Sequence, residues 1–246
     1  PRNRGTANGI LLPLLQIVHR DADASILVLP SDHYVRRETV LAGSLREAMV
    51  QVAACGQRMV MLGLTPQDAD PELGYIVPAG EGGPGVWDVQ QFIEKPDAAT
   101  ARRIIGRGGL WNAFIFAVRG QSLLDVFEAH CPEIVMEMRG FITHPDETTR
   151  TAGLVELYER LPSLDFSRDI LERCATQARV ITVPPCGWSD LGTPRRVAEA
   201  LEEGRPTQQP SAAANHARGI LDLAAQHALT AGRRAFETYE SSAQVI

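Results

Sequence analysis

The sequence predicts an α/β protein with a largely parallel sheet, and three observations lead to that prediction. A short apolar run at Ser25–Leu29 has the β-branched and leucine content of a buried strand. A helical stripe of apolar residues follows over Glu38–Ala54, and a second apolar run follows at Met59–Leu64. A strand, a helix and a strand in this order form a crossover unit, which is typical of parallel sheets.

The rest of the chain continues this alternation up to residue 203. Further strands are predicted over Gly74–Val77, Val86–Ile93, Trp111–Val118 and Arg179–Val183, and further helices over Thr6–His19, Ala98–Ile105, Gln121–His130, Glu133–Thr143, Leu154–Arg160, Arg168–Cys174 and Pro194–Glu203. After Gly204, the polar stretch "RPTQQPSAAAN" has the composition of a linker. We therefore expect a main domain over residues 1–203, and a polar linker with a C-terminal helical tail over residues 204–246.

The composition limits the class of protein. The 246 residues are 44% hydrophobic and carry a formal net charge of −6, which predicts no general attraction to nucleic acid or to an anionic membrane surface. No apolar run approaches the length of a membrane span. Cys55, Cys131, Cys174 and Cys186 lack the spacing of a metal site or a disulfide framework. We expect a cytoplasmic protein with free thiols.

Lys95 is unusual because it is the only lysine among 24 basic residues. In a chain that otherwise uses arginine, a single lysine indicates a place where a compact ammonium is needed and a flat guanidinium does not fit. The alternative is that one lysine survived by chance. Lys95 lies in "FIEKPD", directly after a predicted strand, and this position favours the functional interpretation.

Polar residues adjoin the ends of several predicted strands. Asp32 follows one strand in "PSDH", Asp190 follows another in "CGWSDLG", and Glu94 and Lys95 lie at the end of a third. Asn112, in "WNAFIF", lies at the beginning of a strand. Ligands of parallel α/β sheets bind beyond the carboxyl ends of the strands, so we expect these residues to share a cleft. Two aspartates suit a hard ion such as Mg²⁺, and a lysine suits a phosphate. An amide and a carboxylate can hydrogen-bond the hydroxyl groups of a sugar.

Each of these residues also has a purely structural interpretation. Asp32 could stabilise a turn, Asp190 could cap a helix, and the Glu94–Lys95 pair could be a solvated surface pair. We favour the ligand role for the two aspartates and for that pair. For Asn112, pairing with backbone groups and binding a ligand are equally supported.

The ordered set of motifs resembles the sugar-1-phosphate nucleotidyltransferases, most closely the mannose-1-phosphate guanylyltransferase branch. The resemblance covers roughly residues 1–203 and rests on "PRNRGTANGILLPLL", "LVLPSDHYV", "PELGYIVP", "FIEKPD", "WNAFIF", "SLDFSRDIL" and "CGWSDLGTPRRV". It implies a Rossmann-like nucleotidyltransferase fold of the type-A glycosyltransferase kind, with a mixed, mainly parallel sheet flanked by helices. It also implies a reaction in which a hexose 1-phosphate and an NTP give an NDP-sugar and pyrophosphate. GTP and mannose 1-phosphate are the leading substrate pair, and GDP-mannose is the product.

The resemblance also implies roles for individual residues. Asp32 and Asp190 match the two aspartates that hold Mg²⁺, and Lys95 matches the lysine that holds the sugar phosphate. Glu94 and Asn112 match groups that bind sugar hydroxyls. The remaining two are glycines: Gly74 matches a glycine whose backbone approaches the sugar, and Gly5 matches a residue against the nucleotide base.

The sequence departs from the family pattern in three places. The glycine-rich phosphate loop, roughly G-G-x-G-x-R, is absent from this chain, and the stretches "LGYI" and "WNAFIF" differ from the family's usual forms. We expect either an N-terminally truncated chain or an inactive relative. A catalytically inactive or regulatory sugar-nucleotide-binding subunit is therefore the alternative function. A glycosyltransferase is a weaker third possibility, because no Asp-x-Asp pair lies in a fitting place. The sequence leaves a homo-oligomer open.

Overall fold

The computed structural model describes residues 2–80, 85–144 and 146–203. Contacts divide the chain into two units, Pro1–Arg196 and Val197–Ile246. The predicted C-terminal helical tail lies outside the described residues. No helix in the described part of the chain is long and apolar enough to cross a membrane.

The elements follow the predicted order closely. The strands are β1 (Ser25–Val28), β2 (Tyr34–Val35), β3 (Val60–Leu64), β4 (Tyr75–Pro78), β5 (Val86–Ile93), β6 (Leu110–Arg119), β7 (Arg179–Val183) and β8 (Trp188–Ser189). The helices are α1 (Gly5–Arg20), α2 (Glu38–Cys55), α3 (Ala98–Ile105), α4 (Gly120–His130), α5 (Pro132–Ile142), α6 (Glu147–Arg160), a π-helical turn at Phe166–Leu171, α7 (Glu172–Cys174), a 3₁₀ turn at Ala175–Gln177 and α8 (Pro194–Glu203).

The main sheet is mixed, and its strands are mostly antiparallel. The strand order is β1-β6-β3-β7-β5-β4, and β4 also pairs with β6, so that five strands form a closed ring of hydrogen-bonded neighbours. In the described residues only the β3–β7 pair is parallel, with Val60 opposite Arg179. The prediction of a mainly parallel sheet was therefore wrong.

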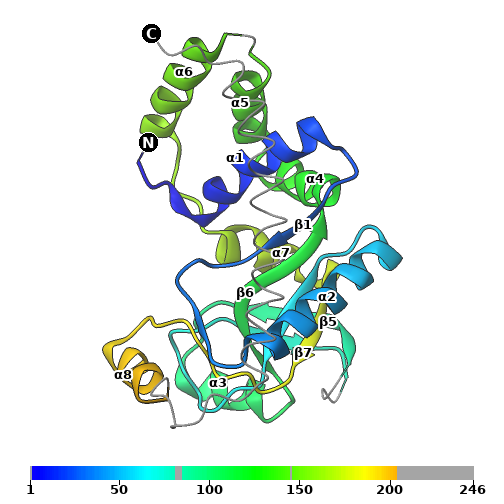
Figure 1. Cartoon of the computed structure of the whole chain (residues 1–246), viewed down its shortest axis with the longest axis vertical. Coiled ribbons are helices and arrows are strands. Elements are labelled where there is room, and N and C mark those ends of the chain that lie inside the picture. The colour runs from blue at the N-terminus through cyan, green and yellow to red at the C-terminus, as the bar shows by residue number, and fades with distance from the viewer. Residues whose placement is uncertain (1, 81–84, 145, 204–246) are drawn as a thin grey trace, which may run out of the picture. The chain divides into compact units, whose positions relative to one another are not determined.

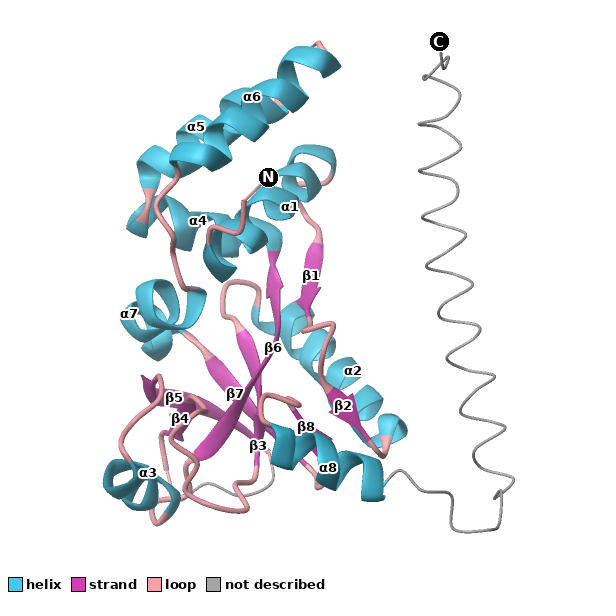
Figure 2. Ribbon diagram, turned by 90° about the vertical axis from the view of Figure 1, so that its left-hand side faces the viewer, coloured by secondary structure: helices cyan, strands magenta, loops and turns pink. Residues whose placement is uncertain are grey.

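The physical reason lies in β6. The crossover through α2 makes β1 and β3 run in the same direction, as the sequence predicts, but they are not neighbours. The ten-residue strand β6 lies between them and pairs antiparallel with both, placing Val118 opposite Ile26 and Phe116 opposite Met61. Figure 2 shows β6 running beside β1 before it continues along the other strands.

Apolar side chains from both faces of the sheet form two cores. Along β6, Phe116 and Val118 belong to a core with α1, α4, α5 and α6, whereas Ile115 and Ala117 belong to a core with α2 and α3. This alternation is the two-residue period of a strand that is buried on both faces. Helices α1, α4, α5 and α6 pack against one another as a group (Figure 1).

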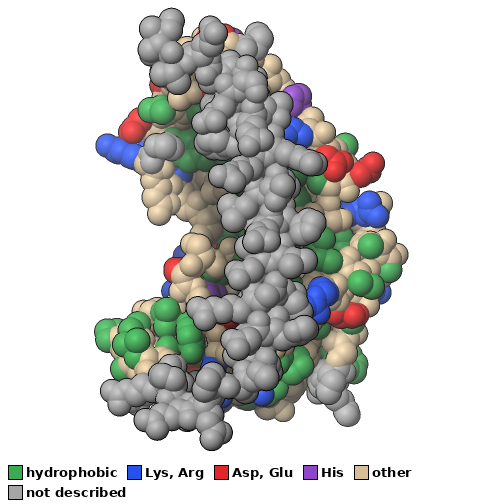
Figure 3. All heavy atoms as spheres, in the orientation of Figure 1, with side chains coloured by type: hydrophobic (Ala, Val, Ile, Leu, Met, Phe, Trp, Pro, Cys, Tyr) green, Lys and Arg blue, Asp and Glu red, His purple; other side chains and the backbone are tan. Residues whose placement is uncertain are grey.

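Charged side chains lie mainly outside these cores. Figure 3 shows one face, on which acidic and basic side chains are interspersed among hydrophobic ones. Exposed ion pairs such as Arg139–Glu128 contribute little to stability, because water already solvates both charges. Cys174 and Cys186 are buried free thiols, and burial raises the pKa of Cys174 to about 11. These two cysteines therefore behave as apolar core residues.

Candidate active site

Asp32 and Asp190 are brought together by a small second sheet. Strands β2 and β8 pair antiparallel, with Tyr34 opposite Ser189 and Val35 opposite Trp188. Each aspartate lies just beyond this short ladder, and both carboxylates act electrostatically on the imidazole of His33. Two acids that are distant in the sequence thus lie near one histidine. Asp32 and His33 line a groove, and Asp190 is not among its lining residues, so the shared cleft stays a prediction.

The imidazole of His33 is held in a defined orientation by Trp188. The indole Nε1 of Trp188 donates a hydrogen bond of 3.1 Å to His33 Nδ1, and the two rings meet edge to face with centroids 5.1 Å apart. Because Nδ1 accepts this bond, the ring proton of the neutral imidazole lies on Nε2. Burial lowers the pKa of His33, while the carboxylates of Asp32 and Asp190 act in the opposite direction.

Asp190 has a partner that the sequence analysis missed. Nη1 of Arg196 donates to both carboxylate oxygens of Asp190, at 2.7 and 2.8 Å, and the amide of Gly192 donates to Oδ1 at 3.1 Å. The second guanidinium nitrogen, Nη2, donates to Asp70. The Asp190 carboxylate is therefore held by a buried arginine, whereas that of Asp32 is exposed.

This donor set can still accommodate Mg²⁺. A carboxylate has about four acceptor positions, two on each oxygen. On Oδ2 of Asp190, the bond from Arg196 occupies one of them. Mg²⁺ commonly takes only one or two protein carboxylates and keeps waters and substrate phosphate oxygens as its other ligands. In the described part of the chain, no group of three or more His, Cys, Asp or Glu could hold a metal. A hydrated Mg²⁺ would therefore fit here if Asp32 and Asp190 each supplied an oxygen and water or substrate supplied the rest.

Gly74, Glu94 and Asn112 form a second cluster. A Cβ atom placed on Gly74 would lie 2.6 Å from Oε2 of Glu94 and 3.5 Å from Cβ of Asn112. The amide of Asn112 donates to the carbonyl of Gly74 at 2.8 Å, and its side-chain Oδ1 accepts from the amide of Phe114 at 3.0 Å. A side chain at position 74 would displace the Glu94 carboxylate. Within the described residues, no acceptor is found for the side-chain amide nitrogen of Asn112, which can therefore donate to a ligand.

Within this cluster, the charge of Glu94 is influenced by nearby groups that include Lys95, the next residue in the chain. Burial raises the pKa of Glu94, Asp165 raises it further, and the cations Lys95 and Arg168 oppose the shift. Nζ of Lys95 lies 3.6 Å from Oε2 of Glu72 in an exposed ion pair. We expected Lys95 beside the two aspartates, but the ion pair found for it is with Glu72, on the side of the Gly74 cluster.

Gly5 has a structural reason to be glycine. Its φ of +84° is left-handed, and a Cβ atom there would lie 2.2 Å from the carbonyl oxygen of Leu164. Both constraints exclude other residues at the start of α1. The position of Gly5 against a nucleotide base stays a prediction.

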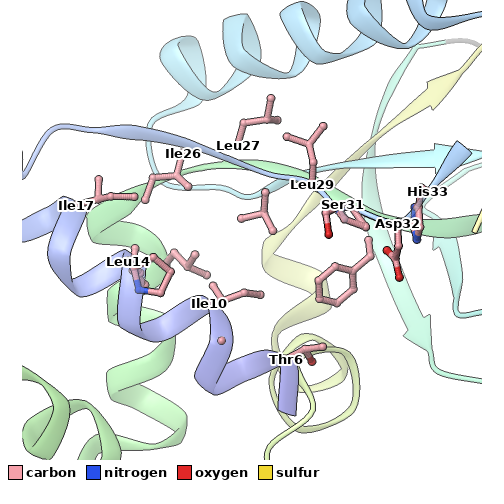
Figure 4. A pocket seen from close by; sticks show the side chains of 16 residues that line it. Thr6, Ile10, Leu14, Ile17, Ile26, Leu27, Leu29, Ser31, Asp32 and His33 are labelled. Atoms are coloured by element: carbon pink, nitrogen blue, oxygen red, sulfur yellow. The ribbon is translucent and has the colours of Figure 1, made fainter. Parts of the chain in front are cut away.

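One groove is lined by residues from, or next to, the segments of Asp32, Gly5 and Asn112. It has a volume of about 640 Å³ and is lined by Asp32 and His33, by Thr6 next to Gly5, and by Phe114 near Asn112. Figure 4 shows Ile10 and Leu14 on α1 across the groove from β1, with Ser31, Asp32 and His33 at one end. The groove therefore has apolar walls and a polar end that carries a carboxylate, which suits a ligand with an apolar face and a charged group.

Comparison with known proteins places the chain in a family. The family model described as "Nucleotidyl transferase" matches residues 1–205. The chain belongs to this family. A relative called alginate biosynthesis protein AlgA from Pseudomonas fluorescens is 30% identical over 196 residues, which are 78% of this chain and 40% of the relative. A putative mannose-1-phosphate guanylyltransferase from Vibrio cholerae is 26% identical over 198 residues, or 78% of this chain and 41% of the relative.

A solved structure supports the nucleotidyl transferase fold. The crystal structure of a mannose-1-phosphate geranyltransferase from Thermus thermophilus, as it is described, aligns with a TM-score of 0.67 at 28% identity, covering 85% of this chain and 57% of that one. The α/β fold found here, with its mixed sheet, is thus the nucleotidyl transferase fold. The chain spans about two fifths of the length of the two relatives named above.

Several non-glycine residues near the candidate site residues have a left-handed backbone conformation. Among the described residues, Lys95, Phe114 and Leu191 are the non-glycine residues with positive φ, at +46°, +54° and +53°. Lys95 directly follows Glu94, and Leu191 directly follows Asp190. Phe114 lies two residues after Asn112 and donates its backbone amide to the Asn112 side chain. Such conformations cost free energy and persist where the surrounding structure imposes them, often at functional sites. They mark the same segments that the sequence motifs indicate.

Glu94 allows a test of the electrostatics of the second cluster. The raised pKa means that folding favours protonated Glu94, so its contribution to stability is present below the unfolded pKa and is lost as pH rises through the folded pKa. We expect Glu94→Gln, which mimics the protonated form, to raise the Tm at pH 7 and to leave it nearly unchanged at pH 4. Thermal unfolding followed by circular dichroism at both pH values measures this. A lower Tm at pH 7 would show that the charged form is stabilised instead.

Proposed function

We propose that this chain transfers a nucleotidyl group from an NTP to a hexose 1-phosphate, forming an NDP-sugar and pyrophosphate. GTP and mannose 1-phosphate are the proposed substrates, and GDP-mannose is the proposed product. The observation that carries the proposal is the pairing of β2 with β8, which brings Asp32 and Asp190 near His33 from distant parts of the sequence. The mannose-1-phosphate guanylyltransferase among the relatives supports this choice of base and sugar.

The residues have separate roles in this proposal. Asp32 and Asp190 would hold Mg²⁺, which when bound would neutralise charge on the phosphates. Lys95 holds the phosphate of the sugar, and the Asn112 amide and Glu94 bind its hydroxyls. The absence of a side chain at Gly74 lets the Glu94 carboxylate lie close to the backbone there, beside the proposed sugar site. The phosphate oxygen of the sugar attacks the α-phosphorus of the NTP in line, so the chain acts by positioning its substrates and needs no covalent intermediate.

The second candidate function is binding without turnover. The observation that favours it is the engagement of both Asp190 oxygens by Arg196, which neutralises a proposed metal ligand with an internal cation. In that case the cluster around Gly74 binds a sugar nucleotide, and the chain acts as a regulatory subunit.

Pyrophosphate release and calorimetry together separate the two functions. We expect release that requires GTP, mannose 1-phosphate and Mg²⁺ together, with UTP, ATP and glucose 1-phosphate as comparison substrates. Release with a different nucleotide or sugar phosphate would correct the proposed base or sugar and leave the proposed reaction unchanged. Binding of GDP-mannose that does not depend on Mg²⁺, without any release, favours the regulatory function. Neither release nor binding with any pair contradicts both functions.

A further inference from the structure

Arg196 joins two segments that carry different halves of the candidate site. One of its guanidinium nitrogens, Nη1, binds both oxygens of Asp190, and the other, Nη2, binds Oδ2 of Asp70. The side chains are 10% exposed for Arg196, 11% for Asp70 and 19% for Asp190. Hydrogen bonds between ionised groups that are shielded from water are strong, and the planar guanidinium fixes their direction.

Asp70 transmits this connection to the segment that contains Gly74. Its Oδ1 accepts from the amide of Glu72 at 2.8 Å, and its carbonyl accepts from the hydroxyl of Tyr75 at 2.9 Å. Tyr75 is fully buried, and its hydroxyl oxygen accepts in turn from Nε1 of Trp111 at 3.0 Å, next to Asn112. Hydrogen bonds therefore connect Asp190 through Arg196, Asp70 and Tyr75 to Trp111. Trp111 directly precedes Asn112, whose backbone amide donates to the carbonyl of Gly74.

The end at Asp190 is equally constrained. The amide of Gly192 donates to Asp190 Oδ1 at 3.1 Å, and the amide of Leu191 donates to Ser189 Oγ at 3.2 Å. Leu191 has a left-handed φ of +53°, so this turn is held in a conformation that the chain would otherwise avoid. Loss of the guanidinium would leave two partly buried carboxylates without their cation, which is strongly unfavourable.

We propose that Arg196 is a positioning residue that clamps Asp190 to the Asp70–Gly74 segment and so fixes the two halves of the site relative to each other. The inference rests on the proposed function only for the identity of what each half binds. A neighbouring pair provides a matched control, because Arg195 Nη2 lies 3.5 Å from Asp68 Oδ2 with both side chains more than half exposed. An exposed pair of this length contributes little.

Hydrogen exchange of the whole chain, followed by mass spectrometry, tests the clamp without any substrate. The variants are Arg196→Lys, which can still reach a single carboxylate, and the milder Asp70→Asn, with Arg195→Lys and Asp68→Asn as controls. We expect Arg196→Lys to speed exchange at least tenfold in residues 70–74 and in residues 189–192. Asp70→Asn should do so in residues 70–74 alone, and the controls in neither. Unchanged exchange in residues 70–74 in both test variants, or equal acceleration in the controls, overturns the proposal.

A kinetic measurement separates positioning from a merely structural role. We expect Asp70→Asn to raise the KM for the sugar phosphate about tenfold while the KM for the nucleotide changes less than twofold. A structural role alone would lower the active fraction, and therefore kcat, with both KM values unchanged, and that result contradicts positioning. If the wild-type chain releases no pyrophosphate, the proposed function fails, and the exchange experiment still decides whether Arg196 is a clamp.

Discussion

Replacing Asp32 with asparagine is expected to lower kcat for pyrophosphate release by at least about 100-fold, as the loss of a preorganised electrostatic group typically does. Asp32 is exposed at the polar end of the groove. Its carboxylate is thus accessible to a cation and a substrate phosphate. Asparagine keeps the size of the side chain and removes the charge, so the loss reports on charge alone.

The fold should tolerate this substitution. An exposed side chain away from the cores typically changes the free energy of unfolding by less than about 0.5 kcal/mol when it is replaced. Asp23→Asn is a suitable control, because Asp23 is also exposed and lies in the turn before β1. Steady-state pyrophosphate release at saturating GTP, mannose 1-phosphate and Mg²⁺ measures the effect. Equal rates for Asp32→Asn and wild type would remove Asp32 from the catalytic machinery.

The sequence was sufficient to predict most elements but not how the strands pair. Periodicity and capping residues are local signals: Asp97 accepts from the amide of Thr100 at 2.6 Å and begins α3 where the sequence predicts. Strand order depends on contacts between distant segments. Nothing local in "LWNAFIFAVR" shows that β6 lies between β1 and β3, and an apolar strand that is buried on both faces reads alike in parallel and antiparallel surroundings.

The site was predictable only as far as its motifs allow. Asp32 and Asp190 could be named as partners because each follows a predicted strand, but β2 and β8 span two residues each and are too short to show a period. Little in the sequence indicated the role of Arg196, since it is one of many arginines and its partners Asp70 and Asp190 are remote from each other. The position of Arg196 six residues after Asp190, at the start of α8, is the only hint in the sequence.

Replacing Lys95 with methionine is expected to raise the KM for the sugar phosphate by about 10- to 100-fold, the usual cost of losing a hydrogen bond to a charged group. The contacts of Lys95 in the structure contribute little to the stability of the fold. Its ion pair with Glu72 is 3.6 Å long, with side chains 48% and 63% exposed, and such pairs contribute almost nothing to stability. Lys95 also has a left-handed φ of +46°, which a lysine adopts only at a cost.

Lys95→Arg tests why this chain, otherwise supplied with arginine, has a lysine here. If a compact ammonium is required, arginine restores only part of the affinity although it restores the whole charge. Calorimetric titration with mannose 1-phosphate measures the affinity directly, and Glu72→Gln controls for loss of the ion pair alone. We expect Glu72→Gln to bind within about twofold of wild type, Lys95→Arg to bind more weakly, and Lys95→Met to bind most weakly. Full binding by Lys95→Met would instead make Lys95 a surface residue that remained lysine by chance.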